Sequence, residues 1–586
     1  MCQGIRFGGL IGFGLLAAAF AAGQTDPDKA GRTGLPDDWS HHHIVFSQPD
    51  STERLDQVHA DLRYWQQVER SVSRARGETV VRRPRRAATK VDWGQALATP
   101  ATAGLNFSNV ATSPAKYSFN GTNPDCANDY VVFALPTGAS TAANLYAFTN
   151  LYVNNSGTGA CLGASPVALF TYNASRGGGS LNSSPTLSLD GTQIGFVEDS
   201  TSAQFHVLKW KAGDVSMTFG MPWNSSLLPD CAANGAVAPC EYSVVYSAHT
   251  ATLSAPYVDY TADTAYVTDD AGMVAAISPV FGGGTPKVVF SVTTSGNAAM
   301  TPPVYDSVSK NVFAADANGI LYYVRTTAAS GGACGSGNPP CVGTPTLTIS
   351  NGTPISDAPI VDSSSGTVFV FTNSGLPATS GPGAHALTLH SSVVQTSTTL
   401  GTMQVAYVGP QGASPVYDGA FNNAYYNNPG SGVLYVCGTN SSNIPQLYGV
   451  TFTGTQMNQG PAAYGPLALG FSAAACSPLT EVYNQSTSRD LVFLGVNAGC
   501  YGDIKTACIA EFDVTNGFPS ANTATVPEAN GTTGIIIDNV SNGSSGNASQ
   551  TNLYFVTLGE EPCTEYTGGI ANLANCLVKL TQTGLQ

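Results

Sequence analysis

Short runs of β-branched, aromatic and aliphatic residues, separated by Gly, Asn, Asp and Pro, follow one another along most of the chain. The stretch "TPPVYDSVSKNVFAADANGILYYVRT", at 301–326, shows the pattern in one unit. Val312, Phe313 and Ala315 lie in a β-prone run, "DANG" supplies the Asn-Gly dipeptide of a tight hairpin turn, and "ILYYV" resumes a strand. The pattern predicts a meander of short strands. Because such a meander exposes two edges and buries little apolar surface, we expect it to stack against similar units.

The same unit recurs along the chain. Most copies begin with Pro, two β-prone residues and an acid, as in Pro303 to Asp306. The starts fall at positions 114, 185, 256, 303, 359, 415, 478 and 535. A second strand follows each start, for example "TVFVFTN", then a third, for example "HALTL", and in most copies a fourth, for example "PKVVFSV". Four antiparallel strands repeated at intervals of 47 to 71 residues are typical of propeller blades.

The predicted fold class is therefore all-β, a single β-propeller of eight four-stranded blades, with seven blades as the alternative. The last unit ends at Gln586 just after its third strand, so its fourth strand must come from elsewhere. The segment "KVDWGQAL", at 90–97, directly precedes the first unit and offers Val91, Trp93 and Leu97. We expect the propeller to span 90–586 and to be closed by this N-terminal strand.

Residues 24–89 form an N-terminal extension of a different kind. Apolar residues recur there at steps of three and four, namely Leu55, Val58, Leu62, Trp65, Val68 and Val72. This spacing predicts a short amphipathic helix at about 50–76, which we place outside the ring. A basic linker at 82–90, with four arginines, follows the helix. It is interpreted as a flexible linker or, alternatively, as a docking arm for an acidic partner.

The first 23 residues combine one positive charge at Arg6, an apolar stretch and small residues near Ala21, which predicts a secretory signal peptide. A membrane anchor is the alternative, but the stretch is Gly-rich and shorter than the roughly 20 residues that a spanning helix needs. No later segment approaches that length. The mature protein is therefore expected to be secreted, periplasmic or associated with the cell surface, with no transmembrane segment.

Cysteine usage agrees with export. Cys2 leaves with the signal peptide, and an even number of cysteines in an exported chain is typical of disulfides. The sequence leaves the connectivity of the remaining cysteines open. They occur as pairs of near neighbours along the sequence: Cys126 and Cys161, Cys231 and Cys240, Cys334 and Cys341, Cys437 and Cys476, Cys500 and Cys508, Cys563 and Cys576. Local pairing would fix insertions such as "CGSGNPPC". Metal binding is not expected, because no C-x-x-C occurs and no cysteine has a His at ligand spacing.

The motifs "VFAADANGILYYV" and "AYVTDDAGMVAAI" resemble repeats of the quinoprotein-alcohol-dehydrogenase-like propeller superfamily. "SPTLSLDGTQIGFVEDS" is similar to TolB-like repeats, although Leu189 replaces their proline. The chain at 90–586 also resembles a group of uncharacterised secreted bacterial propeller proteins. The resemblance implies the fold but not one function, since these repeats serve enzymes and binding scaffolds alike. A quinone cofactor would require adjacent cysteines, which this sequence lacks, so no cofactor is expected.

An acidic residue closes the first strand of most units. These candidate residues are Asp259, Asp306, Asp362, Asp418, Glu481 and Asp538. One interpretation is a ring of carboxylates near the central channel that binds a cation or a basic ligand. The favoured interpretation is that each carboxylate caps a turn by accepting backbone N–H bonds, because a functional site usually breaks the symmetry of its repeats.

Composition and charge limit the function. A net charge of -15 and a pI near 4.8 argue against nucleic acid as a partner. No nucleophile elbow or zinc-protease motif occurs, and the "HHH" at 41–43 is interpreted as a solvated segment. We therefore expect a monomeric, non-catalytic propeller that binds or scaffolds an extracellular protein or polysaccharide. The alternative is a hydrolase or lyase acting on an extracellular polymer, with its acids among Glu198, Asp199, Asp269 and Asp270.

Overall fold

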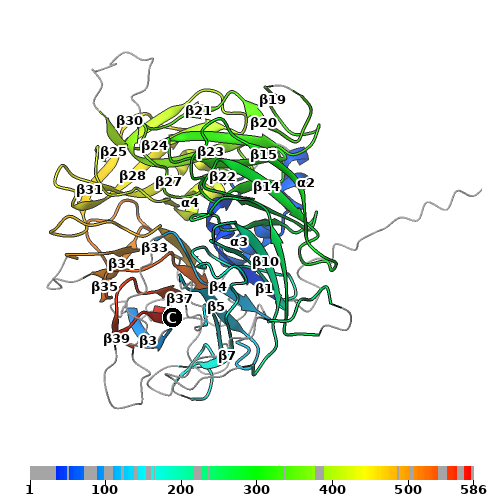
Figure 1. Ribbon diagram of the computed structural model, residues 1–586. Coiled ribbons are helices and arrows are strands. Elements are labelled where there is room, and N and C mark those ends of the chain that lie inside the picture. The colour runs from blue at the N-terminus through cyan, green and yellow to red at the C-terminus, as the bar shows by residue number, and fades with distance from the viewer. Residues whose placement is uncertain are drawn as a thin grey trace, which may run out of the picture.

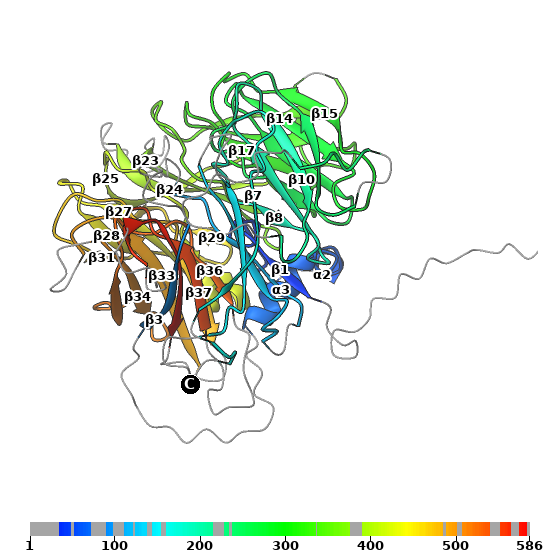
Figure 2. The ribbon, with the colours of Figure 1, turned by 60° about the horizontal axis from the view of Figure 1, so that its bottom comes forward.

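The computed structural model shows an all-β propeller of small twisted sheets around a central axis (Figures 1 and 2). The described residues are 34–48, 52–71, 89–97, 110–120, 124–136, 143–153, 160–163, 165–214, 228–233, 237–335, 337–375, 389–484, 488–500, 507–538, 551–563 and 573–582. The predicted signal peptide and the predicted basic linker up to residue 88 lie outside them. Among the helices described, none is both long enough and apolar enough to span a bilayer.

Seven successive segments of the chain each form one antiparallel sheet, which begins near the axis and runs outward. The first sheet contains β4 (Ala115–Ser118), β5 (Tyr130–Ala134), β6 (Leu145–Thr149) and β7 (Val167–Tyr172). The second contains β8 (Thr186–Leu187), β9 (Gln193–Glu198), β10 (Gln204–Lys209) and β11 (Cys240–Val245). The third contains β12 (Tyr257–Asp259), β13 (Thr264–Thr268), β14 (Met273–Ser278) and β15 (Lys287–Thr293). The fourth contains β16 (Val304–Asp306), β17 (Asn311–Ala315), β18 (Ile320–Arg325), β19 (Ala333–Cys334), β20 (Cys341–Thr344) and β21 (Leu347–Thr348).

The remaining sheets follow the same course. The fifth contains β22 (Ile360–Asp362), β23 (Thr367–Gly375), β24 (His390–Ser397) and β25 (Gln404–Pro410), and β30 (Gly460–Pro461) adds to β25 in parallel. The sixth contains β26 (Ala420–Phe421), β27 (Val433–Thr439), β28 (Pro445–Thr453), β29 (Gln456–Met457) and β31 (Tyr464–Ala468), with α4 (Asn423–Asn427) and the 3-10 turn η1 (Pro429–Ser431) between β26 and β27. The seventh contains β32 (Thr480–Asn484), β33 (Arg489–Val496), β34 (Cys508–Asp513) and β35 (Ala524–Pro527).

A composite sheet, here called the closing sheet, joins the two ends of the chain. It contains β36 (Ile536–Asp538), β37 (Thr551–Val556), β40 (Cys576–Gln582) and β3 (Thr89–Ala96), and the hairpin β38 (Glu561–Pro562) and β39 (Leu573–Ala574) lies between β37 and β40. β3 pairs antiparallel with β40, from Thr89 opposite Gln582 to Ala96 opposite Cys576. Trp93 on β3 is fully buried, and its indole N–H donates to the Leu151 carbonyl oxygen at 3.0 Å. The closing sheet is thereby tied to the first sheet.

Apolar side chains between neighbouring sheets form the core. β5 and β17 are buried along their whole length, because sheets cover both of their faces. Phe170 of the first sheet and Phe196 of the second share one cluster, and Phe133 of the first shares another with Tyr554 of the closing sheet. Every described sheet is packed in this way against the next one, so the ring is closed.

The N-terminal extension lies against the inner strands of the ring, and its helices extend off the axis on one side (Figures 1 and 2). β1 (Leu35–Asp37) pairs antiparallel with β4, and β2 (Ile44–Val45) pairs in parallel with β22. Between them lies α1 (Ser40–His43), and after them α2 (Thr52–His59) and α3 (Leu62–Ser71), of which α3 contacts β32. Residues 34–48 and 52–71 are called the plug below. The plug therefore reaches the innermost strands of the first, fifth and seventh sheets.

The predicted fold class is wrong in its count and in its N-terminal part. In place of eight equal four-stranded blades, seven continuous segments form blades, the sheets have four to six strands, and the chain ends combine in the closing sheet. The single helix predicted at about 50–76 outside the ring is also not found. Residues 52–71 form two helices separated at Ala60 and Asp61, and α3 packs against β2 and the inner strand β32. Their apolar face is only partly covered, since Val58 is buried and Leu62 is exposed. The insertions that hold the extra strands carry no repeat signal.

Six disulfides confirm the pairing of neighbouring cysteines. Three of these disulfides bridge the connections at one end of the first, second and fourth sheets: Cys126–Cys161, Cys231–Cys240 and Cys334–Cys341. Three lie at the opposite end of the sixth, seventh and closing sheets: Cys437–Cys476, Cys500–Cys508 and Cys563–Cys576. This number of disulfides indicates an oxidising compartment.

Replacing Trp93 by Ala should lower the free energy of unfolding by about 3 to 5 kcal/mol, because a fully buried indole and its hydrogen bond to Leu151 are lost. Thermal melting followed by circular dichroism measures the effect. Trp65→Ala, which removes a partly exposed indole from α3, is the control and should cost less than half as much. Equal losses would contradict a closing role for Trp93.

Replacing Cys334 and Cys341 together by Ser should lower stability by about 2 to 3 kcal/mol and leave the fold intact, because the disulfide closes only a short loop. Limited proteolysis should show faster cleavage between the two positions and at no other site. Peptide mapping without reduction supplies the check on connectivity. A peptide that links either cysteine to another sheet would refute the local pairing.

Candidate functional site

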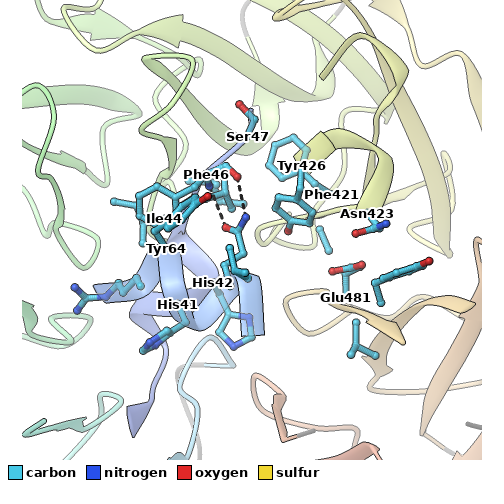
Figure 3. A pocket seen from close by; sticks show the side chains of 18 of the residues that line it. His41, His42, Ile44, Phe46, Ser47, Tyr64, Phe421, Asn423, Tyr426 and Glu481 are labelled. Carbon is cyan, nitrogen blue, oxygen red and sulfur yellow. Dashed lines mark hydrogen bonds between the residues drawn. The ribbon is translucent and has the colours of Figure 1, made fainter. Parts of the chain in front are cut away.

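A cavity of about 190 Å³ lies between the plug and the inner strands of the fifth, sixth and seventh sheets (Figure 3). Its walls come from two parts of the chain that are far apart in sequence. The plug contributes His41, His42, Ile44, Phe46, Tyr64 and Gln67. The ring contributes Ile360, Phe421, Asn423, Tyr426, Glu481 and Tyr483.

The plug wall is held by hydrogen bonds between β2 and α3. The Phe46 backbone N–H donates to the Gln67 Oε1 at 3.0 Å, and the Gln67 Nε2 donates back to the Phe46 carbonyl oxygen at 2.8 Å (Figure 3). The rings of Phe46 and Tyr64 meet edge to face, with centroids 5.7 Å apart. Ile44, Phe46 and Val58 form a small buried apolar cluster behind them. These contacts hold β2 and α3 together within the plug.

The ring wall is built around α4. The Phe421 ring stacks on Tyr425 at a centroid distance of 4.0 Å, and the Tyr425 hydroxyl donates to the Asp362 Oδ2 at 2.8 Å. The same Asp362 oxygen accepts a hydrogen bond from the Ser47 hydroxyl of the plug at 2.7 Å. Asp362 thus joins the fifth sheet, the sixth sheet and the plug at the edge of the cavity.

A pair of carboxyl groups stands behind the ring wall. Glu481 on β32 lines the cavity, and Asp490 on the neighbouring strand β33 is only 5% exposed. The Asn423 backbone N–H donates to the Asp490 Oδ2 at 2.8 Å. Burial raises the pKa of Asp490 above its usual range, although the hydrogen bonds from Glu481 and Asn423 oppose that shift.

Arg63 also lines the cavity, and it anchors the plug to the third sheet. Its guanidinium is 3% exposed, donates to the Val258 carbonyl oxygen at 3.0 Å, and lies 4.3 Å from the centroid of the Tyr257 ring. Burial alone would raise the pKa of the nearby Asp38, but its hydrogen bond with His41 and the charges of His41 and Arg63 outweigh burial and lower that pKa to about 2. A buried cation is thereby satisfied by a carbonyl, aromatic faces and a carboxylate.

His43 lies between two buried carboxyl groups of the ring. Its Nε2 is 3.8 Å from the Asp357 Oδ1, and its Nδ1 is 3.6 Å from the Asp418 Oδ2. Burial lowers the pKa of His43 to about 3 and raises the pKa of Asp357 to about 6. Burial and the charge of Asp357 also raise the pKa of Asp418 well above its ordinary value. A plug histidine with a lowered pKa thus lies beside two ring aspartates with raised pKa values. Burial favours the neutral form of all three side chains.

The six predicted acids do not gather in one site. Asp259, Asp306 and Asp362 each accept backbone N–H bonds from the turn that follows. Asp418 faces His43, and Asp538 forms an ion pair with Lys116 at 2.7 Å. Of the six, only Glu481 lines the cavity. Within the part of the chain that the structure describes, no three His, Cys, Asp or Glu side chains are grouped to hold a metal ion.

The other candidate acids are engaged in local structure. Glu198 accepts from the Gly179 N–H at 2.7 Å and pairs with His206 at 3.1 Å. Asp199 accepts from the Asn182 side chain at 2.9 Å. Asp269 accepts from the Ser247 hydroxyl and Asp270 from the Thr250 hydroxyl. These four carboxylates therefore cap turns or join ion pairs.

Some residues of the cavity escaped the sequence analysis. The segment "AFNNAYYNN", at 420–428, supplies Phe421, Asn423 and Tyr426, and its density of aromatic and amide side chains outside a strand pattern was the available signal. The "HHH" at 41–43 was interpreted as solvated, whereas His43 is 4% exposed in the channel. Its burial depends on partners several hundred residues away, which no local pattern records.

No protein-family model matches the chain, and no curated protein sequence matches it. Among solved structures, Sqt1 from Chaetomium thermophilum has a TM-score of 0.43 at 10% identity, over 84% of this chain and 96% of that chain. The WD40 domain of Toxoplasma gondii coronin has a TM-score of 0.37 at 7% identity, over 67% of this chain and 78% of that one. BamB from Moraxella catarrhalis has a TM-score of 0.36 at 12% identity, over 77% and 98%. These likenesses carry no functional argument, and the predicted quinoprotein-like or TolB-like kinship stays a prediction beyond the propeller fold itself.

Replacing Asp418 by Asn should raise the melting temperature at pH 7.5 and change it little at pH 4. The folded protein holds the Asp418 pKa above its value in the unfolded chain, so the stability that this group contributes is present at acid pH and is lost as the pH rises. Each unit by which the pKa in the folded protein exceeds the pKa in the unfolded chain lowers the free energy of unfolding at neutral pH by about 1.4 kcal/mol. The exposed-carboxyl variant Asp230→Asn is the control and should leave the pH profile of melting unchanged. A D418N protein that melts lower at both pH values would contradict this account.

Proposed function

We propose that the protein is an exported, non-catalytic β-propeller that binds an extracellular protein or polysaccharide through the connections at the ends of its blades. The observation that carries the proposal is the set of six disulfides, which fix connections at both ends of the ring. A connection that is held in one conformation before binding loses less conformational entropy when a partner docks. Loops on a rigid scaffold are also where binding residues are commonly found.

The occupied channel supports the same function. Because the plug pairs with β4 and β22 at the centre of the ring, a large partner would meet the protein at its outer connections. The alternative, a polymer-degrading hydrolase or lyase, needs an acid and a base that are available to substrate. The carboxylates that the sequence offers for this role, such as Glu198 and Asp269, are committed to ion pairs and turns.

The test combines binding and turnover on the same preparation. The purified protein is applied to a glycan array and to an array of extracellular proteins, and each polysaccharide is then assayed for released reducing ends and for unsaturated products. We expect binding to one ligand class with no product. The C334S/C341S variant, whose loop is freed, serves as a matched variant and should bind more weakly if that connection takes part. Product release would overturn the non-catalytic assignment, and absence of binding to both arrays would overturn the proposed ligand classes.

A further inference from the structure

The sixth sheet is built from a segment of the chain that contains no charged residue. From residue 419 to residue 480 there is no Asp, Glu, Lys, Arg or His, and all strands of the sixth sheet lie within these bounds. The same holds for residues 514–527, which connect β34 to β35 and include β35 itself. The net charge of -15 therefore comes from the rest of the chain. A surface without charges cannot steer a charged partner toward itself.

Three aromatic rings form a stack where the sixth and seventh sheets meet. Phe518 comes from the connection between β34 and β35, and its ring lies between those of two tyrosines of the sixth sheet. The Phe518 and Tyr435 centroids are 6.1 Å apart with 17° between the ring planes, and the Phe518 and Tyr464 centroids are 5.8 Å apart with 15° between the planes. In the sheet, Gly449 of β28 is the partner of Tyr435 on one side and of Tyr464 on the other. These three rings are called the aromatic stack below.

Gly449 makes the aromatic stack possible. A Cβ atom at this position would lie 3.1 Å from the Phe518 Cδ2 and 3.2 Å from the Tyr464 Cβ, so a larger residue would push the Phe518 ring away from the sheet. Tyr435 is fully buried, whereas Tyr464 is 43% exposed. The stack thus has one buried end and one exposed end. Because Phe518 covers the inner face of the Tyr464 ring, the outer face is held in place before any ligand arrives.

The exposed end of the stack lies at the outer edge of the sixth sheet, among hydroxyl and amide groups. Tyr464 is the first residue of β31, which pairs with β28 on the outer side of the sheet (Figure 1). Thr451 of β28 projects from the same face of the sheet, and its hydroxyl oxygen accepts a hydrogen bond from the Asn458 side chain at 2.8 Å. Asn458 is exposed, and so is Asn516 in the connection that carries Phe518. Hydroxyl and amide groups can both donate and accept hydrogen bonds.

These features fit an uncharged sugar better than a protein or a charged polymer. The C–H groups on one face of a pyranose ring contact a flat aromatic face, and the hydroxyl groups around the ring form hydrogen bonds with amides and hydroxyls. A protein partner would gain specificity from charged groups at the rim, and this surface supplies none. The nearest charged residues, Asp513 and Arg489, pair with one another at 2.8 Å. The net charge of the protein also repels anionic polymers.

We propose that the outer face of Tyr464 is a subsite for one sugar ring of a neutral polysaccharide, with Thr451, Asn458 and Asn516 as hydrogen-bonding partners of the sugar hydroxyls. This proposal rests on the binding function proposed above, and it names a neutral polysaccharide, rather than a protein, as the ligand. A protein ligand that binds elsewhere on the propeller would leave that function intact and would refute only this subsite.

Calorimetric titration with cellohexaose, xylohexaose, mannohexaose, laminarihexaose and maltohexaose tests the ligand class, and hexagalacturonate is the charged counterpart. We expect saturable binding of at least one neutral hexasaccharide and at least tenfold weaker binding of hexagalacturonate. If none of the five neutral compounds binds, or if hexagalacturonate binds as tightly or more tightly, the proposal is overturned. In that case a protein found on the array would still support the binding function.

Variants of the exposed ring locate the subsite. Tyr464→Ala should weaken binding of the neutral hexasaccharide at least tenfold, whereas Tyr464→Phe keeps the flat face and should bind within threefold of the wild type. Phe471→Ala is the matched control, because it removes another exposed ring, 63% exposed, that follows the far end of β31; it should bind as the wild type does. Equal losses in Y464A and Y464F would show that the ring face does not bind the sugar.

A second position keeps the test independent of folding. Thermal melting followed by circular dichroism establishes whether Y464A is folded. If it is not, Asn458→Ala, which changes an exposed side chain beside the ring, should weaken binding several-fold. Wild-type affinity in whichever of these two variants folds would place the sugar elsewhere and refute the assignment.

Discussion

The pairing of β3 with β40 is the contact on which the ring depends. Each sheet of a propeller buries both faces against its neighbours, so a single gap in the ring would expose two apolar faces at once. β3 and β40 come from opposite ends of the chain, so joining them costs conformational entropy. The contacts within the closing sheet must offset that cost. Trp93 strengthens this joint, because it packs on the first sheet as well as within the closing sheet.

Closure of the ring creates a second requirement at the centre. The first strand of each sheet presents a backbone edge to the channel, and an unpaired edge invites association with other chains. Here β1 covers the edge of β4 and β2 covers the edge of β22. The buried apolar cluster of the plug is small, with Ile44, Phe46 and Val58. Trp39 and Val45 of the plug also join the apolar clusters of the ring. The hydrogen bonds of Arg63 to Val258 and of Ser47 to Asp362 add directional contacts.

The sequence predicted what repeats locally. The strand pattern identified the propeller, and "KVDWGQAL" was expected to be a strand because it offers Val91, Trp93 and Leu97. The sequence left the disulfide connectivity open, and the six disulfides join the cysteines that are near neighbours in the sequence. The plug was missed because β1 and β2 are two or three residues long and show no periodicity of their own. Its amphipathic helices were visible, but an apolar helix face does not tell which surface covers it. The carboxyl clusters were missed for the same reason, since Asp357 and Asp490 acquire their partners only in the folded ring.

The acids that recur in the units acquire different roles because the connections after them differ. After Asp259, Asp306 and Asp362 the turn to the next strand has four residues, at 260–263, 307–310 and 363–366, and the carboxylate caps it. After Asp418 the chain instead forms β26, α4 and η1 before β27 begins at Val433, which places Phe421 and Tyr426 beside the plug. The four-residue turns keep these three carboxylates as turn caps, although Asp362 also accepts hydrogen bonds from Ser47 of the plug and from Tyr425. Asp418, before the longer connection, faces His43 of the plug instead. The cavity therefore lies where α4 and η1 interrupt the repeat, and the segment at 419–432, between Asp418 and β27, is the feature of the sequence that marks it.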